Sequence, residues 1–112
     1  MSYELMDELQ QKMKQLDVAY KQLRKSGIAR AEAERDYKIA LSKKGLMLRE
    51  EGMAVGMIEI AIYGTEEIAA LRFKRDTADV VYKANQECIN CLKLEIKVID
   101  NQINREWSVR ND

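Results

Sequence analysis

A stripe of mostly apolar residues runs along the last third of the chain, at spacings that alternate between four and three residues. This spacing averages about 3.5 residues, the period at which an α-helix keeps one line of side chains facing a partner helix. The stripe consists of Ala78, Tyr82, Asn85, Ile89, Leu92, Ile96, Ile99 and Ile103. We expect it to form the seam of a coiled coil and the interface of an oligomer.

A matching stripe opens the chain and is followed by a second set in shifted phase. The first set is Met6, Leu9, Met13, Leu16, Tyr20 and Leu23, and the second is Ile28, Ala31, Ala33, Tyr37, Ala40, Leu41 and Leu48. The ten residues from Leu23 to Ala33 exceed one heptad by three, an insertion that overwinds a coiled coil or marks a kink. Because one glycine costs a helix only about 1 kcal/mol relative to alanine, Gly27 predicts a bent but continuous helix.

Glycines then divide the chain into three elements. Gly52 suits the end of a long helix, and Gly64 and Thr65 indicate a break followed by an N-cap. The chain contains no proline, so nothing forbids very long helices. The expected elements are a long helix over about 3–51, a short apolar helix over about 54–63 and a long helix over about 65–107, in one domain spanning 1–112.

The short connection between the long elements favours an antiparallel helical hairpin, with the short apolar helix at its tip. A second, half-apolar stripe lies beside the first on the last helix. Its members are Val81, Cys88, Cys91, Glu95 and Val98. An apolar face of this width indicates that more than two helices meet. The fold class is therefore all-α, and dimerisation of the hairpin into a helical bundle is the simplest way to cover that face.

Asn85 interrupts the seam with a polar side chain. A buried asparagine reduces stability but favours the one register in which a polar partner faces it. The alternative is that Asn85 marks a point where the seam opens to water.

The charge balance argues against two kinds of partner. Nineteen basic and nineteen acidic residues give no net charge, so no global field steers the chain to nucleic acid or to an anionic membrane. The apolar run at 57–63 is broken by Glu59 and is too short to span a bilayer. The first eight residues include the acidic residues Glu4, Asp7 and Glu8, unlike the basic start of a secretory signal. We therefore expect a cytoplasmic protein without a membrane partner.

Cys88 and Cys91 form a C-x-x-C motif in the middle of a predicted helix. Redox motifs of this kind lie at helix N-termini instead. A structural zinc site needs about four ligands, and the chain has no histidine and no other cysteine. The sequence favours packing beside the seam, with a four-thiolate site shared by two chains as the alternative.

Enzymatic motifs are missing from the sequence. It contains no histidine for general base chemistry, and no phosphate-binding loop or nucleophile elbow. Glu32, Glu34 and Asp36 suggest a bundle metal site, but such sites use Glu-x-x-His pairs. Solvated, ion-paired faces explain these carboxylates better. We predict a non-enzyme with no cofactor, no catalytic residue and no metal.

The hairpin tip is the predicted contact region. Apolar and arginine side chains dominate many binding interfaces, and both kinds gather here. The expected partner-binding residues are Arg49, Met57, Ile62, Tyr63, Arg72, Phe73 and Arg75. Alternatively, Met57, Ile62 and Phe73 only close the tip.

A basic collar at the tip supports nucleic-acid binding as the alternative function. Lys43, Lys44 and Arg49 on the first long helix approach Arg72, Lys74 and Arg75 on the last to form this collar. Its candidate nucleic-acid contacts are Lys43, Lys44, Arg72 and Lys74, and the rhythm of helices here is that of a helix-turn-helix. However, Glu66 and Glu67 begin the last helix, where phosphates would be repelled. Residues 43–76 carry as many acidic as basic residues, so ion pairing is the expected use of the collar.

Four segments carry a resemblance to a known group. They are AEAERDYKIAL, LREEGMAVGMI, AALRFKRDTADVVYKANQE and INREW, within residues 30–107. The chain resembles small helical proteins of phages and prophages of Gram-positive bacteria, although members often have proline where this chain has Ala54. Their genes often lie near those for single-strand annealing and single-strand-binding proteins. The resemblance implies a phage accessory protein in the bacterial host cell. The expected partners of the chain are a second copy, with which it forms a homodimer, and another protein. This protein is a phage recombination or replication factor, or a component of a host defence or nuclease system.

Overall fold

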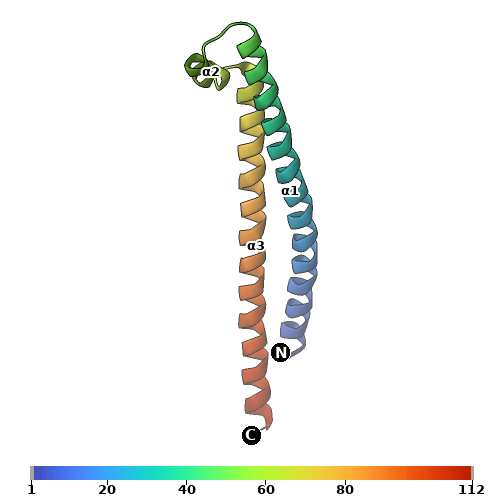
Figure 1. Ribbon diagram of the computed structural model, residues 1–112. Coiled ribbons are helices and arrows are strands. Elements are labelled where there is room, and N and C mark those ends of the chain that lie inside the picture. The colour runs from blue at the N-terminus through green and yellow to red at the C-terminus, as the bar shows by residue number, and fades with distance from the viewer. Residues whose placement is uncertain (1, 112) are drawn as a thin grey trace. The chain divides into compact units, whose positions relative to one another are not determined.

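The computed structural model describes residues 2–111, and the side chains of residues 3–109. Three helices follow one another: α1 (Ser2–Glu50), α2 (Val55–Ile62) and α3 (Glu66–Asn111) (Figure 1). Residues 2–111 contain no strand. The predicted all-α helical hairpin is confirmed, and α3 continues beyond the predicted end at residue 107.

α1 ends in a Schellman motif at Gly52. The Met53 N–H donates to the Leu48 carbonyl at 3.1 Å, and the Gly52 N–H donates to the Arg49 carbonyl at 3.0 Å. These two bonds require a left-handed residue between them, and Gly52 supplies it with φ of 92°. The local sequence therefore ends the helix where the glycine was expected to end it.

Thr65 joins α2 to α3 in an unexpected way. It directly precedes α3, and its carbonyl accepts a hydrogen bond from the Ala69 N–H at 2.9 Å. Its hydroxyl does not cap the helix: Oγ1 donates to the Ile62 carbonyl at 2.8 Å. The predicted N-cap position is correct, but the side chain closes the end of α2 instead of satisfying an N–H of α3.

The chain divides into two compact units. We call Ser26–Tyr82 the α2 unit, and Met1–Lys25 with Lys83–Asp112 the terminal unit. In each unit a segment of α1 pairs with an antiparallel segment of α3, as the contacts Arg30–Asp79 and Lys12–Glu95 show.

The α2 unit has a core to which all three helices contribute. Its buried residues are Tyr37, Leu48, Ile62 and Ile68, and Ala40, Leu41, Met53, Ile58 and Leu71 pack around them. The Ile68 side chain is completely buried. α2 is therefore fixed to the long helices by one of its sides.

The terminal unit has a narrower core between two helix segments. Ala19, Ile89 and Leu92 are buried, and Leu16 and Leu23 pack against them. Ile89 and Leu92 of the α3 stripe thus pack against α1 of the same chain. The role of the stripe as an oligomer interface stays a prediction.

α1 keeps one heptad register through Gly27. The helix is continuous, and its buried positions Ala19, Ser26 and Ala33 lie seven residues apart. The predicted three-residue insertion is wrong. Met6, Met13 and Tyr20 lie one position off this line and are exposed. The register was hidden because polar residues occupy seam positions: Lys12 is half-buried and reaches Glu95, and Ser26 is buried.

Candidate functional site

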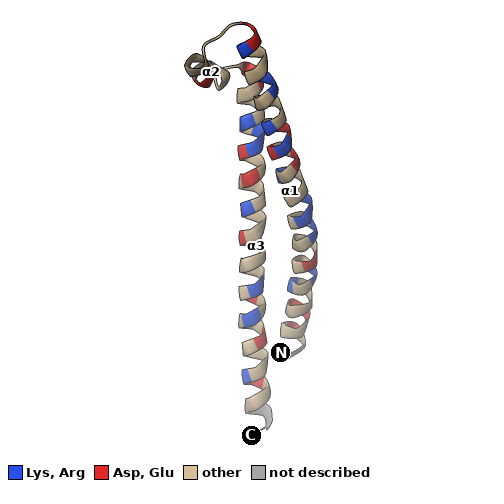
Figure 2. Ribbon diagram, in the orientation of Figure 1, with Lys and Arg blue, Asp and Glu red and all other residues tan. Residues whose placement is uncertain are grey.

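α2 exposes large apolar side chains on the side that faces away from the core. We call Val55, Met57, Ile60 and Tyr63 the α2 face; their exposed fractions are 66, 54, 74 and 46%. Glu59 is the one charged residue of α2 (Figure 2). Exposed apolar clusters of this kind mark interaction sites more often than chance exposure of single residues does.

Other predicted contact residues lie on α1 and α3 in the same unit. Arg49 is exposed, and Phe73 is 74% exposed. The Arg72 guanidinium lies over the Tyr63 ring, 5.6 Å from its centroid, a favourable cation–π geometry. This contact joins the first turns of α3 to the α2 face.

One of the predicted contact residues lies in the core instead. Ile62 is only 6% exposed and belongs to the core, so its predicted role as a surface contact is wrong. Val55 and Ile60 are exposed instead. Apart from Glu59, the side chains of α2 are apolar on all sides, so its sequence gives little indication of which side turns inward. Tertiary contacts decide which side of α2 packs inward, and a helix of eight residues cannot specify those contacts alone.

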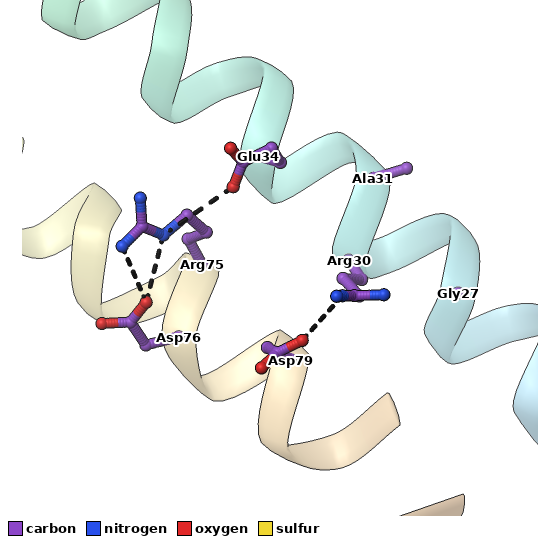
Figure 3. Close-up of a pocket in the computed structure, with 7 residues that line it drawn as sticks. All are labelled: Gly27, Arg30, Ala31, Glu34, Arg75, Asp76 and Asp79. Carbon is purple, nitrogen blue, oxygen red and sulfur yellow. Dashed lines mark hydrogen bonds and ion pairs between the residues drawn. The ribbon is translucent and has the colours of Figure 1, made fainter. Parts of the chain in front are cut away.

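Arg75 belongs to a network between α1 and α3 (Figure 3). Its Nη2 lies 3.0 Å from Asp76 Oδ1, its Nε lies 3.8 Å from Glu34 Oε2, and its guanidinium stacks 4.4 Å from the Tyr37 ring centroid. The hydrogen bond to Asp76 raises the pKa of Arg75, despite partial desolvation. These partners engage the guanidinium within the chain, and the expected contact of Arg75 with a partner stays a prediction.

A second ion pair extends this network by one turn. Arg30 Nε lies 2.7 Å from Asp79 Oδ1, and the guanidinium stacks 4.9 Å from the Tyr82 ring centroid. Together with Arg75 and its partners, the pair lines a shallow groove of about 460 Å³ (Figure 3). Since opposite charges satisfy one another here, the groove joins the helices and offers no reactive group.

Only part of the basic collar forms ion pairs. Among the described residues, Arg75 pairs with Asp76 and Glu34, whereas none of Lys43, Lys44, Arg72 and Lys74 forms a salt bridge. Lys43 and Lys44 line a groove of about 350 Å³ that Glu67 also lines. Lys43, Lys44 and Lys74 therefore have no salt-bridge partner among the described residues, but Asp36 and Glu67 line the same groove as the first two.

Two of the three carboxylates considered as metal ligands, Glu34 and Asp36, have other partners. Glu34 lies 3.4 Å from Lys38 and also faces Arg75, and Asp36 pairs with Arg35 at 3.1 Å. Within the described part of the chain, no group of three or more potential ligands could hold a metal ion. Cys88 and Cys91 are free and exposed, so the predicted packing of both thiols beside the seam is wrong.

None of the helices within residues 2–111 combines the length and apolar character needed to cross a membrane. Comparison of the chain with known protein families, with curated proteins and with solved structures finds no match. The assignment of a functional class therefore rests on the residues of the site.

Proposed function

We propose that this chain is a non-enzymatic helical hairpin protein that binds another protein through the α2 face. The observation that supports this proposal is the exposure of Val55, Met57, Ile60 and Tyr63 around an eight-residue helix. Burying apolar surface contributes about 25 cal/mol per Å². Covering the α2 face with a partner would therefore supply a substantial driving force for association.

The surroundings of the α2 face suit a protein interface. Aromatic and arginine side chains contribute most to many interfaces; Tyr63 belongs to this face, and the Arg72 guanidinium lies over its ring. Ile58 and Ile62 attach α2 to the core, so little conformational freedom is lost on binding. A preorganised apolar helix with Arg72 at its edge is a surface that a protein partner with an apolar groove and an acidic edge would recognise.

The resemblance to phage proteins suggests the partner's class. A protein of phage recombination or replication is the first candidate, and a host defence or nuclease system is the second. Either role fits a protein without catalytic groups, because binding alone can recruit a factor or block a surface.

The test is affinity capture from phage-infected host lysate, before and after nuclease treatment. Ile60→Asp places a charge in the α2 face, and Val80→Asp is the matched control, since Val80 is 65% exposed on α3 outside that face. We expect the wild type and Val80→Asp to capture a protein that stays bound after nuclease treatment, and we expect Ile60→Asp not to capture it. Equal retention by both folded variants, checked by circular dichroism, would exclude the α2 face.

Direct nucleic-acid binding is the second candidate, because the collar lysines have no salt-bridge partner among the described residues. Phosphate contacts make binding strongly salt-dependent. We would compare a Lys43→Gln, Lys74→Gln variant with Lys97→Gln, a control on an exposed residue of the terminal unit. Binding of short DNA that weakens with salt and is reduced only in the collar variant would support this function. No binding at low salt would exclude it.

A further inference from the structure

We infer that two copies of this chain bind one Zn²⁺ ion through Cys88 and Cys91 of each copy. Both thiols are free and exposed, and their spacing of three residues on α3 places them on one side of the helix. Zinc in structural sites takes four ligands in a tetrahedron. One chain therefore supplies two of the four ligands of a zinc site. A second copy carries the same two cysteines and supplies the other two ligands.

Packing does not explain the two cysteines. The buried line of α3 in this region is formed by Ile89 and Leu92, while both thiols remain in contact with solvent. Cys88 also lines an apolar groove of about 490 Å³ with Val18 and Leu92. Cys88 thus borders the contact between α1 and α3, but both thiols are exposed, so a second molecule can reach them.

The helical spacing fits the geometry of a shared ion. A Zn–S bond is about 2.3 Å long, which puts two sulfurs of a tetrahedral site about 3.8 Å apart. Residues three apart on a helix have Cβ atoms about 5–6 Å apart, so both thiols of one turn can converge on one ion. A two-fold axis brings the same patch of each copy together and completes the four ligands.

The surrounding stripe allows a second helix to approach. Ala84 and Val98 continue the line of the two cysteines along α3 without charge, and Glu95 is held by Lys12 of the same chain. On binding, each of four S–H bonds releases its proton to water as a sulfur–zinc bond forms, with no change of oxidation state. The resulting centre carries two negative charges, which Lys14, another residue lining the groove beside Cys88, partly offsets. Thiolate ligands select zinc over magnesium or calcium.

The test is a titration of the reduced full-length protein with Co²⁺, followed by displacement with Zn²⁺. We expect thiolate-to-cobalt charge-transfer bands and the intense visible bands of tetrahedral cobalt, saturating at one metal per two chains. Light scattering should show a dimer with Zn²⁺ that chelator converts back to monomer. Cys91→Ser should lose the bands and the metal-dependent dimer, whereas Ala84→Ser, a small change one turn away, should retain both.

Absence of the cobalt bands, saturation at one metal per chain, or an equal zinc-dependent dimer in Cys91→Ser would overturn the site. The proposal is independent of the α2 face. Ile60→Asp should leave the cobalt spectrum and stoichiometry unchanged, and Cys91→Ser should leave capture through the α2 face unchanged, so the two proposals fail separately.

Discussion

The α2 unit and the terminal unit are built from the same two long helices but form very different cores. In the α2 unit a third helix covers the pair, and Ile68 is completely buried. In the terminal unit two helix segments bury one narrow line, Ala19, Ile89 and Leu92. Two helices cover only one seam, so side chains beside it, such as Met13 and Val98, remain 56 and 55% exposed.

The difference shows that packing of α2 widens a narrow contact between two helices into a three-helix core. The polar contacts of the α2 unit do not account for it, because Arg30 and Asp79 are 47 and 30% exposed, and such pairs contribute only about 0–1 kcal/mol. Burial against α2 is the larger effect. The terminal unit lacks such a third element. Its exposed flank carries Cys88 and Cys91, which we propose bind zinc together with the same residues of a second copy.

The largest expected effect comes from truncating one core residue in each unit. Truncation of buried isoleucine costs about 2–5 kcal/mol. We expect Ile68→Ala, at 0% exposure among three helices, to lose about 4 kcal/mol, and Ile89→Ala, at 4% between two, about 2 kcal/mol. The measurement is urea unfolding with hydrogen exchange to assign the loss to a unit. Equal losses would mean that α2 adds nothing to the core.

A pair of glycines separates backbone strain from packing within the α2 unit. A Cβ at Gly52 or at Gly56 would meet no atom within 4 Å, but only Gly52 has a positive φ. We expect Gly52→Ala to destabilise by about 1–2 kcal/mol because of the left-handed backbone. Gly56→Ala, inside α2, should instead stabilise by about 0.5–1 kcal/mol. Thermal melting of both variants gives the signs, and the same sign for both would contradict the Schellman end.

Asn85 offers a way to strengthen the weaker unit. Its Nδ2 donates to the Gln22 carbonyl at 3.4 Å, a long bond from a half-buried side chain. We expect Asn85→Leu to stabilise by about 1 kcal/mol, since apolar replacement of a polar group in a seam is often favourable, while reducing the specificity of association. Melting temperature and light scattering measure the two effects, with exposed Asn90→Leu as the control. An unchanged melting temperature and oligomeric state would show that the amide has no such role.

The smallest expected effect is the pH dependence of the Lys12–Glu95 contact in the terminal unit. The hydrogen bond to Glu95 raises the pKa of Lys12 above its usual 10.5. A raised lysine pKa stabilises the fold below the usual pKa, and this contribution is lost as pH rises through the higher folded value. We expect a slightly steeper fall in melting temperature above pH 10.5 than in Lys12→Met, with Lys97→Met resembling the wild type. Identical profiles for Lys12→Met and the wild type would contradict this.

Local features of the sequence determined the helical elements. The absence of proline, the glycine at residue 52 and the long heptad stripe of α3 were enough to predict three helices and their ends to within a few residues. These features act through hydrogen bonds and backbone angles of neighbouring residues, so they need no tertiary partner. The α2 face was half predicted for the same reason: a strongly apolar short helix was evident, but its orientation was not.

Tertiary structure alone decided which positions of α2 and of the first half of α1 face inward, whereas Ile89, Leu92 and Ile99 of the α3 stripe are buried as predicted. Lys12 and Ser26 occupy buried-line positions that their polarity disguised, and Met6 and Met13 were displaced from it. Ile62 turned into the core while Ile60 turned out. A helix fixes the angles between its side chains but not its rotation about its own axis. That rotation follows from the total area buried against the other helices, which no local pattern contains.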